Sequence, residues 1–332
     1  MQKNPALLEV RGLRTTFRGE HGEVRAVDGV DLRVERGRTL GIVGESGCGK
    51  SVTALSIMGL VPQPGHIAAG EIFFDGEDLR GAKPERLRDL RGDKLAMIFQ
   101  EPMTSLNPAF PVGDQIAETV LRHRHVSKEE ANHQAFEMLR RVRMPSPERR
   151  AKDYPHQLSG GMRQRVMIAM ALACSPRLVV ADEPTSALDV MVQAQILRLV
   201  DRLVTDQGIG LVMISHDLSV LTSTCDRLVV MYAGRIVEEG PAGEVFSDPR
   251  HPYTAALAAA HPRIGDRASR RNPGGLPGDP PDVERLPEGC SFRPRCPVAV
   301  AGCELLDPPL WPAGAGRRAA CIHVRPVEPG GR

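Results

Sequence analysis

The stretch Gly44-Glu-Ser-Gly-Cys-Gly-Lys-Ser51 decides the fold of this 332-residue chain. It fits the phosphate-loop pattern G-x-x-x-x-G-K-[ST] in full, and it lies between an apolar run at 39–43 and a helical pattern over 50–60. Such a loop joins a buried strand to a helix whose N-terminal N–H groups bind phosphate. We therefore expect Lys50 to reach the β- and γ-phosphates of a nucleotide, and the Ser51 hydroxyl to bind Mg²⁺.

Outward from this loop, strand patterns and helix patterns alternate along the chain. The apolar periodicity predicts strands at 7–17, 24–35, 39–43, 71–74, 94–99, 178–182, 211–215, 227–232 and 235–238, and helices at 50–60, 114–124, 128–142, 190–207 and 217–223. Alternation of this kind favours an α/β fold with a largely parallel sheet covered by helices. The polar helical stretch at about 101–175 indicates a helical subdomain inserted into that core.

Composition narrows the class of protein. The chain has 41% hydrophobic and 25% charged residues, which is typical of a globular protein and excludes wholesale disorder. A net charge of +2 gives no reason to expect a nucleic-acid binder. The longest apolar run, Val166–Cys174, is far shorter than the roughly 20 residues of a membrane-spanning helix. The N-terminal residues lack the long apolar stretch of a signal peptide, so we expect a cytosolic protein.

Two further motifs carry polar chemistry. Leu178-Val-Val-Ala-Asp-Glu183 predicts a buried strand that ends in two carboxylates, where the ligands of open α/β sheets bind. Asp182 can support Mg²⁺, and Glu183 can act as the general base for an attacking water. Leu158-Ser-Gly-Gly-Met162 predicts a helix capped by Ser159, with bare backbone donors that could hold a second phosphate.

Four of the seven cysteines crowd the C-terminal end, in a segment where residues 262–332 hold 13 of the 28 prolines. Their spacing is Cys290-x5-Cys296-x6-Cys303-x17-Cys321, which fits the short gaps of structural zinc sites poorly. Four thiolates also suit a [4Fe–4S] cluster, and four unliganded thiols are a third reading. Because the segment is poor in apolar material, we expect it to order around its ligand, separately from the core that builds the nucleotide site.

Taken in order, these motifs resemble those of the ATP-binding cassette (ABC) ATPases. The resemblance rests on GESGCGKS, Gln100, LSGGM, LVVADE, Ser186-Ala-Leu-Asp189 and His216, and it covers roughly residues 7–260. It implies a P-loop NTPase core with a β-subdomain and an inserted helical subdomain over about 101–175. On this reading, residues 5–260 form the ATP-binding domain, and residues 261–332 form the small Cys-rich C-terminal segment.

Four shorter stretches are similar to the dipeptide, oligopeptide and nickel importers within that family. They are Phe99–Pro108, Tyr154–Leu158, His251-Pro-Tyr253 and Pro287-Glu-Gly-Cys290. Some peptide-importer ATPases carry four C-terminal cysteines in a similar pattern that hold a [4Fe–4S] cluster. The resemblance therefore adds weight to a cluster on Cys290, Cys296, Cys303 and Cys321, with Zn²⁺ as the alternative.

The resemblance also implies roles for individual residues. ATP would be bound by Phe17 against adenine and by Gly44, Glu45, Ser46, Gly47, Cys48, Gly49, Lys50, Ser51 and Asp182. Catalysis would involve Glu183 as base, His216 as γ-phosphate switch, Gln100 and Lys50, with Mg²⁺ held by Ser51 and Gln100. Ser159, Gly160, Gly161 and Gln164 would complete the ATP site of a facing subunit, and Asp189 would couple the two sites.

The resemblance implies an ATPase subunit that energises import of di- or oligopeptides from the cytoplasmic side of the inner membrane. Its partners would be two membrane permeases, a second ATPase subunit that is expected to be a related heterodimer partner, and an extracytoplasmic substrate-binding protein. Import of nickel or glutathione is an alternative. Alternatives of another class are a soluble, non-transport ABC ATPase and a redox- or iron-sensing regulator.

Overall fold

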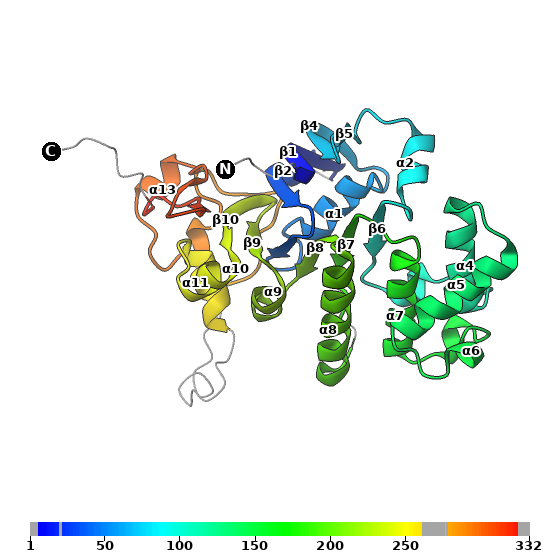
Figure 1. The fold of residues 1–332 in the computed structure, drawn as a ribbon. Coiled ribbons are helices and arrows are strands. Elements are labelled where there is room, and N and C mark those ends of the chain that lie inside the picture. Colours follow the sequence, from blue (N-terminus) through cyan, green and yellow to red (C-terminus); the bar gives the residue numbers. More distant parts are fainter. Residues whose placement is uncertain (1–5, 20–21, 187, 261–275, 277, 325–332) are drawn as a thin grey trace. The chain divides into compact units, whose positions relative to one another are not determined.

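The computed structural model describes residues 6–19, 22–186, 188–260, 276 and 278–324. These residues fall into two compact units, whose elements are labelled in Figure 1. The first unit comprises residues 6–7, 34–38 and 74–213, and the second unit comprises residues 8–33, 39–73 and 214–324. The domain boundary expected at 260/261 lies outside the described residues.

The second unit contains five strands in the order β11-β12-β10-β9-β3. Their bounds are β3 Thr39–Val43, β9 Arg227–Tyr232, β10 Arg235–Pro241, β11 Trp311–Pro312 and β12 Arg318–Ala319. Strands β3 and β9 pair in parallel, as predicted. The pairs β9–β10, β10–β12 and β11–β12 are antiparallel instead. Only Ala233 and Gly234 join β9 to β10, and a connection this short permits only antiparallel pairing.

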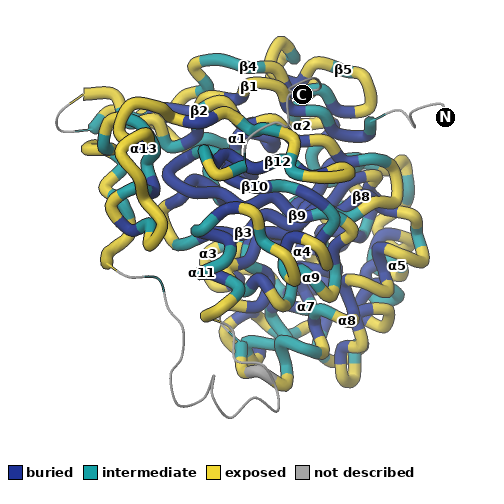
Figure 2. The backbone as a smooth tube through the Cα atoms, turned by 90° about the vertical axis from the view of Figure 1, so that its left-hand side faces the viewer, coloured by how far each residue is buried: buried dark blue, intermediate teal, exposed yellow. Residues whose placement is uncertain are grey.

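The second unit also contains three strands of another sheet, in the order β2-β1-β4, and several helices. The strands are β1 (Ala6–Arg18, which begins in the first unit), β2 (Glu23–Glu35) and β4 (His66–Phe74), and the helices are α1 (Lys50–Met58), α9 (Leu218–Thr224), α10 (Ala242–Ser247) and α11 (Pro252–Ala260). Figure 2 shows β9 and β10 as largely buried. Helix α1 follows the phosphate-loop motif directly and buries Thr53, Ala54 and Ile57, which fixes the end of that loop.

The Cys-rich C-terminal segment is part of the second unit. It contributes β11 and β12 together with two short helices, η2 (Arg293–Arg295) and α13 (Gly302–Leu305). The segment also buries Phe292, which is only 1% exposed. The sequence did not predict these elements, because prolines interrupt every apolar pattern in the segment.

The first unit contains three neighbouring strands in the order β8-β7-β6 and a group of helices. Strands β6 (Leu95–Ile98) and β7 (Leu178–Asp182) pair in parallel, and β8 (Gly210–Ser215) ends in the second unit. The remaining elements are β5 (Glu77–Asp78), α2 (Pro84–Leu90), α3 (Pro102–Ser105), α4 (Val112–His123), α5 (Lys128–Arg141), α6 (Pro147–Arg150), η1 (Pro155–Gln157), α7 (Gly160–Leu172) and α8 (Val190–Gln207). Helices α4, α5 and α7 pack together, and this is the helical block expected from the sequence (Figure 1).

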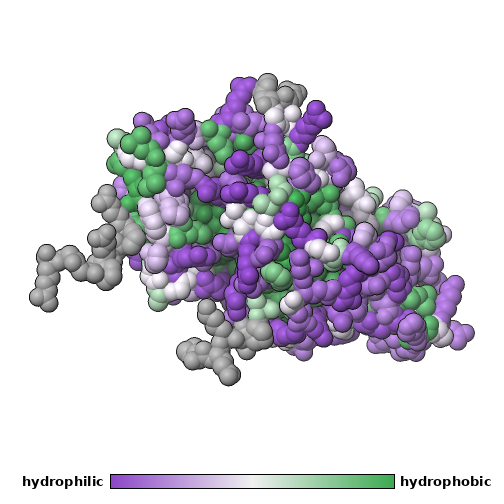
Figure 3. All heavy atoms as spheres, turned by 90° about the horizontal axis from the view of Figure 1, so that it is seen from above, coloured by the Kyte–Doolittle hydropathy of each residue, from purple (hydrophilic) through white to green (hydrophobic). Residues whose placement is uncertain are grey.

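The surface is mostly polar where Figure 3 shows it, with apolar side chains in small groups. Within the described ranges, no helix is both long and apolar enough to cross a membrane.

Candidate functional site

The loop between β3 and α1 can be built only with glycine at two of its positions. A Cβ atom on Gly44 would lie 2.3 Å from the main-chain oxygen of Met231 and 2.6 Å from the Cys48 sulfur. Gly49 has a φ of 100°, and a Cβ atom there would lie 2.3 Å from the main-chain oxygen of Ala26. The loop is therefore a tight backbone cradle at a helix N-terminus, the arrangement that binds a phosphate group.

Lys50 is held inside this loop. Its Nζ donates to the main-chain oxygens of Gly44 at 2.8 Å and Glu45 at 2.9 Å, and the residue is 5% exposed. The Cys48 sulfur lies 3.8 Å from the same nitrogen. Burial raises the pKa of the Cys48 thiol, although Lys50 opposes the shift, so Cys48 is a buried neutral thiol rather than a reactive one.

Glu45, inside the motif, has two partners from distant parts of the sequence. Its N–H donates to the Tyr253 hydroxyl at 2.8 Å. Its carboxylate accepts two hydrogen bonds from Arg295, at 2.6 and 3.0 Å. The hydrogen bonds to Glu45 raise the pKa of the Arg295 guanidinium further above its usual range. Burial likewise raises the pKa of the Tyr253 phenol, so its hydroxyl stays protonated.

The other predicted residues of the second unit lie in the following places. Ser46 and Gly47 are exposed in the loop, and Ser51 is in the first turn of α1. Phe17 is half-buried near the end of β1, so close to Gly65 that a Cβ there would lie 2.4 Å from its ring. His216 is exposed just after β8, and it is therefore not a core histidine.

In the first unit, the two predicted carboxylates end strand β7. Asp182 is 5% exposed, and Glu183 follows it with a φ of 42°, a left-handed conformation that non-glycine residues rarely adopt. Ile98 pairs with Ala181 in the neighbouring parallel strand, so Gln100 follows at the same edge of the sheet. Gln100 is exposed there. These three residues thus extend from adjacent strand ends, where ligands of α/β sheets bind.

The LSGGM motif begins helix α7 as predicted. Ser159 is its N-cap and accepts a hydrogen bond from the Met162 N–H at 3.4 Å. Gly161 lies close to α8, because a Cβ there would be 2.8 Å from Val192. Gln164 is 2% exposed in the first turns of the helix. Gly160 is the first residue of α7 and is half-buried.

Asp189 has a local structural role that the sequence analysis did not predict. It is the N-cap of α8, and its Oδ1 accepts a hydrogen bond from the Val192 N–H at 2.9 Å. Asp189 is otherwise exposed. The cap fixes the start of the helix beside the LSGGM motif, and the expected coupling role stays a prediction.

The four C-terminal cysteines line one pocket, although they lie far apart in this stretch of sequence. Burial raises the thiol pKa of Cys290, Cys296 and Cys321, and neighbouring cysteines raise each of them further. The four are free thiols here, and no group of three or more His, Cys, Asp or Glu residues within the described ranges is arranged to hold a metal ion. Four sulfur donors on one pocket are the ligand set that a [4Fe–4S] cluster takes, and the cluster stays a prediction.

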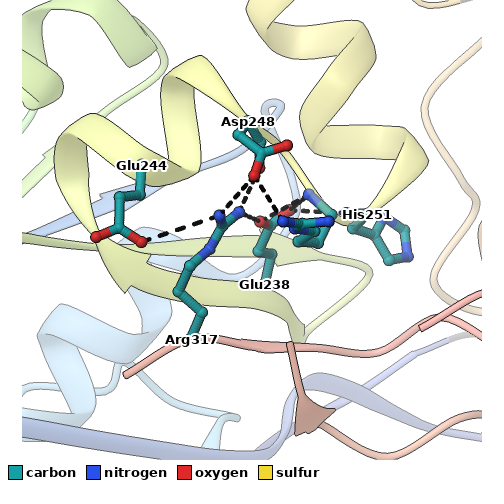
Figure 4. Close-up of polar contacts among 6 residues, drawn as sticks. Glu238, Glu244, Asp248, His251 and Arg317 are labelled. Atoms are coloured by element: carbon teal, nitrogen blue, oxygen red, sulfur yellow. Dashed lines mark hydrogen bonds and ion pairs between the residues drawn. The ribbon is translucent and has the colours of Figure 1, made fainter. Parts of the chain in front are cut away.

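A buried ion pair fastens the C-terminal segment to β10 (Figure 4). Glu238 is 0% exposed and accepts a hydrogen bond from Arg317 at 3.1 Å and from the N–H groups of Arg250 and His251. Arg317 also donates to the Asp248 carboxylate at 3.2 Å. Glu238 and Arg317 thus compensate each other's charge, although they lie 79 residues apart in sequence.

His251 connects this ion pair to the phosphate loop. Burial lowers the pKa of its imidazole to about 4, so the ring is neutral near pH 7. Its Nδ1 accepts a hydrogen bond from the Tyr253 N–H at 3.1 Å, and the Tyr253 hydroxyl reaches Glu45. The His251-Pro-Tyr253 motif is therefore a structural link between the C-terminal segment and the loop.

Comparison with known proteins identifies the family. Residues 27–186 match the family model described as ABC transporter, and residues 237–303 match the one described as the C-terminal region of the oligopeptide/dipeptide transporter. The chain is 51% identical to the probable peptide ABC transporter ATP-binding protein y4tR of Sinorhizobium fredii, over 98% of each chain. The chain belongs to the ABC transporter family. It is also 48% identical to the oligopeptide transport ATP-binding protein OppD of Escherichia coli, over 98% of this chain and 95% of that protein.

A solved structure of an ABC protein agrees with this assignment. The dimeric post-hydrolysis structure of the ATP-binding cassette MJ0796 bound to ADP and Pi matches with a TM-score of 0.65 and 28% identity. The match covers 71% of this chain and 98% of that chain. The expected fold is thereby confirmed as an ABC ATPase cassette with a P-loop NTPase α/β core, and the chain is an ATPase of the peptide-transport branch of the family.

Sequence reasoning missed several residues of this ABC ATPase that support the site. Arg295, Glu238 and Arg317 were not singled out, and Tyr253 was noted only as part of a family-like motif. Arg317 lies 79 residues from Glu238, and Tyr253 and Arg295 lie 208 and 250 residues from Glu45, so no local pattern exposes these contacts. The expectation that the C-terminal segment is separate from the nucleotide-site core is wrong, because Arg295 contacts that loop directly.

Proposed function

We propose that this ABC ATPase is the ATP-hydrolysing subunit of an importer that moves di- or oligopeptides through two membrane permeases. The observation that carries the proposal is identity of 48–51%, over nearly the full length, to proteins named as peptide or oligopeptide transport ATP-binding proteins. The match of residues 237–303 to the oligopeptide/dipeptide transporter C-terminal region supports the same substrate class. Import of nickel or glutathione is the alternative within this class.

In this proposal, residues 5–260 form the ATP-binding domain, with residues 101–175 as its helical subdomain. Backbone N–H groups of the Gly44–Ser51 loop other than that of Glu45 would bind the phosphates, and the Lys50 ammonium would neutralise their charge. Glu183 would accept a proton from the attacking water, and its position directly after β7 supports this role. Asp182, Ser51 and Gln100 would hold Mg²⁺, which supplies charge stabilisation when bound. His216 responds to the γ-phosphate, and Phe17 stacks on adenine.

The other ATP contacts would come from a second cassette. Ser159, Gly160, Gly161 and Gln164 would complete the facing site, because the bare N–H groups at the start of α7 suit a phosphate. Asp189 would then transmit the state of one site to the other. We propose a related second ATPase subunit as the facing partner, so that the pair is a heterodimer.

The permease contact would lie in the segment around α3. This segment exposes two large apolar side chains, Met103 at 50% within the stretch that resembles peptide importers and Phe110 at 54% just after it. Exposed apolar side chains of this size in a polar surrounding suit the binding of a partner helix. We propose that the subunit sits at the cytoplasmic side of the inner membrane through this contact, and that an extracytoplasmic binding protein delivers the peptide.

Cys290, Cys296, Cys303 and Cys321 would hold a [4Fe–4S] cluster. The support is a donor set of four thiols that line one pocket of the second unit. Zn²⁺ is the alternative ligand. A redox or iron sensor would require chemistry at the cluster. A soluble, non-transport ATPase would require an ATPase cycle without peptide uptake.

A gene replacement tests the proposed function. Cells whose only copy carries Glu183→Gln should fail to grow on a di- or pentapeptide as sole nitrogen source, yet grow normally on the free amino acids. Restoring the wild-type gene should restore growth. Normal growth on peptides together with a defect in nickel or glutathione uptake would select the alternative importer, and no uptake defect at all would contradict the transport role.

A further inference from the structure

The C-terminal segment reaches the middle of the phosphate loop. Arg295 and Glu45 are 250 residues apart in sequence, yet the guanidinium donates two hydrogen bonds to the carboxylate. The Arg295 side chain is only 6% exposed, and that of Glu45 is 21% exposed. Paired, planar contacts of this kind hold a carboxylate in one orientation, and shielding from water strengthens them.

All three polar groups of Glu45 are in use. Arg295 holds its carboxylate, Tyr253 accepts from its N–H, and its carbonyl oxygen accepts from Lys50. Two of these three restraints come from outside the loop. The position of the Glu45 main chain, and with it the position of the Lys50 ammonium, therefore depends on residues beyond the motif.

Both restraints from outside the loop depend on the turn between Cys290 and Cys296. Arg295 belongs to this turn, and Tyr253 packs against it. Arg295 directly precedes Cys296 in sequence, and Phe292 lies two residues after Cys290. The Phe292 ring packs edge-on against Tyr253, with ring centroids 5.5 Å apart, and is fully buried. The turn thus touches the loop through a charge pair and supports it through an aromatic contact.

The negative charge of Glu45 predicts that losing its contact with Arg295 would weaken nucleotide binding. A carboxylate in a loop that binds phosphate would repel the nucleotide unless a cation neutralises it. Arg295 is the cation placed to do so, and Lys50 remains available for the phosphates. Tyr253 holds the N–H of the same residue from outside the loop.

We propose that Arg295 and Tyr253 are positioning residues of the nucleotide site, so that the turn between Cys290 and Cys296 sets the affinity of this chain for ATP. The inference rests on the proposed function of Gly44–Ser51 as the phosphate-binding loop. It assigns the C-terminal segment a part in nucleotide binding, through Glu45 rather than by direct contact with ATP.

The test is equilibrium binding of ATP to the full chain, in EDTA so that no hydrolysis occurs. Arg295→Gln should weaken binding at least about fivefold, the lower end of typical coupling between sites. The double variant Glu45→Gln with Arg295→Gln should recover part of the lost affinity, because it removes the uncompensated charge but does not restore the paired geometry. Arg293→Gln is the matched control, since Arg293 lies in the same turn but pairs with Glu304 at 3.2 Å.

The outcomes separate the inference from the function beneath it. If Arg295→Gln binds ATP like wild type while Lys50→Ala binds weakly, the inference is wrong and the phosphate loop stands. If Lys50→Ala also binds normally, the proposed site itself is wrong. A double variant as weak as Arg295→Gln alone would mean that Arg295 acts directly on ATP, which contradicts positioning through Glu45.

A second variant covers the case in which Arg295→Gln does not fold. Arg295→Lys keeps the charge but loses the paired geometry. Its affinity for ATP should be lower than the affinities of wild type and Arg293→Gln, and higher than that of Lys50→Ala. Wild-type affinity for Arg295→Lys, with Lys50→Ala impaired, would overturn the claim that the paired geometry positions the loop.

Discussion

Removing the Arg317 side chain should release the C-terminal segment from the ABC core. In the variant Arg317→Met, the apolar stem of the side chain is largely kept, but Glu238 loses its charged partner at 3.1 Å. Glu238 is 0% exposed, so water cannot replace the guanidinium. From the described part of the chain, the carboxylate then keeps its hydrogen bonds from the N–H groups of Arg250 and His251.

The magnitude follows from this burial. Breaking a buried ion pair by removing one partner costs about 3–5 kcal/mol, because a charge is left without compensation. Arg317 is itself only 5% exposed, which places the pair in this class. Glu238→Gln combined with Arg317→Met should recover part of the loss, since the neutral amide oxygen can still accept from the two N–H groups.

The assay can report on the segment alone. The chain has a single tryptophan, Trp311, and it lies in β11, paired with β12 beside Arg317. Urea unfolding followed by its fluorescence should therefore show the loss in the free energy of unfolding. The neighbouring variant Arg318→Met is the control, because Arg318 pairs with Glu239 while 43% exposed, and it should cost no more than about 1 kcal/mol. Equal, small losses for both arginines would refute the reasoning.

Three further outcomes are expected. Glu183→Gln should bind ATP normally but hydrolyse it about 10²–10⁴ times more slowly in the assembled complex, as for a lost general base, and turnover at the wild-type rate would contradict the assignment. Lys50→Ala should instead lose ATP binding. Protein purified without oxygen should be brown with about four irons per chain, and Cys296→Ser should lose both colour and iron; a colourless protein with one zinc would instead favour zinc. Cysteines introduced at Met103 and Phe110 should cross-link to the permeases, and labelling of the partner ATPase alone would count against that docking surface.

The regular elements of the α/β core could be predicted because their signals are local. Strand 178–182, helix 190–207 and strand 227–232 have the predicted bounds, since a continuous apolar run or a helical period marks each one. The phosphate loop could be predicted as well, because its glycines, lysine and serine are consecutive. Its backbone in the structure explains why Gly44 and Gly49 cannot be replaced.

The support of the site could not be predicted in the same way. Arg295 reaches Glu45 across 250 residues, and neither residue belongs to a periodic pattern. The C-terminal strands β11 and β12 are two residues each, too short to give an alternation. Phe292 lies in a proline-rich stretch with few apolar residues, yet it is buried. Its side chain packs against other elements of the second unit, which the sequence pattern around it does not show.

The most direct test of the account is the uptake of a labelled tripeptide into proteoliposomes that contain the permeases and both ATPase subunits, with binding protein outside and ATP inside. Peptide should accumulate only with internal ATP, in step with hydrolysis, and Glu183→Gln in this chain should abolish both. ATP hydrolysis without peptide accumulation, or accumulation that persists in the Glu183→Gln complex, would contradict the claim that this chain powers peptide import.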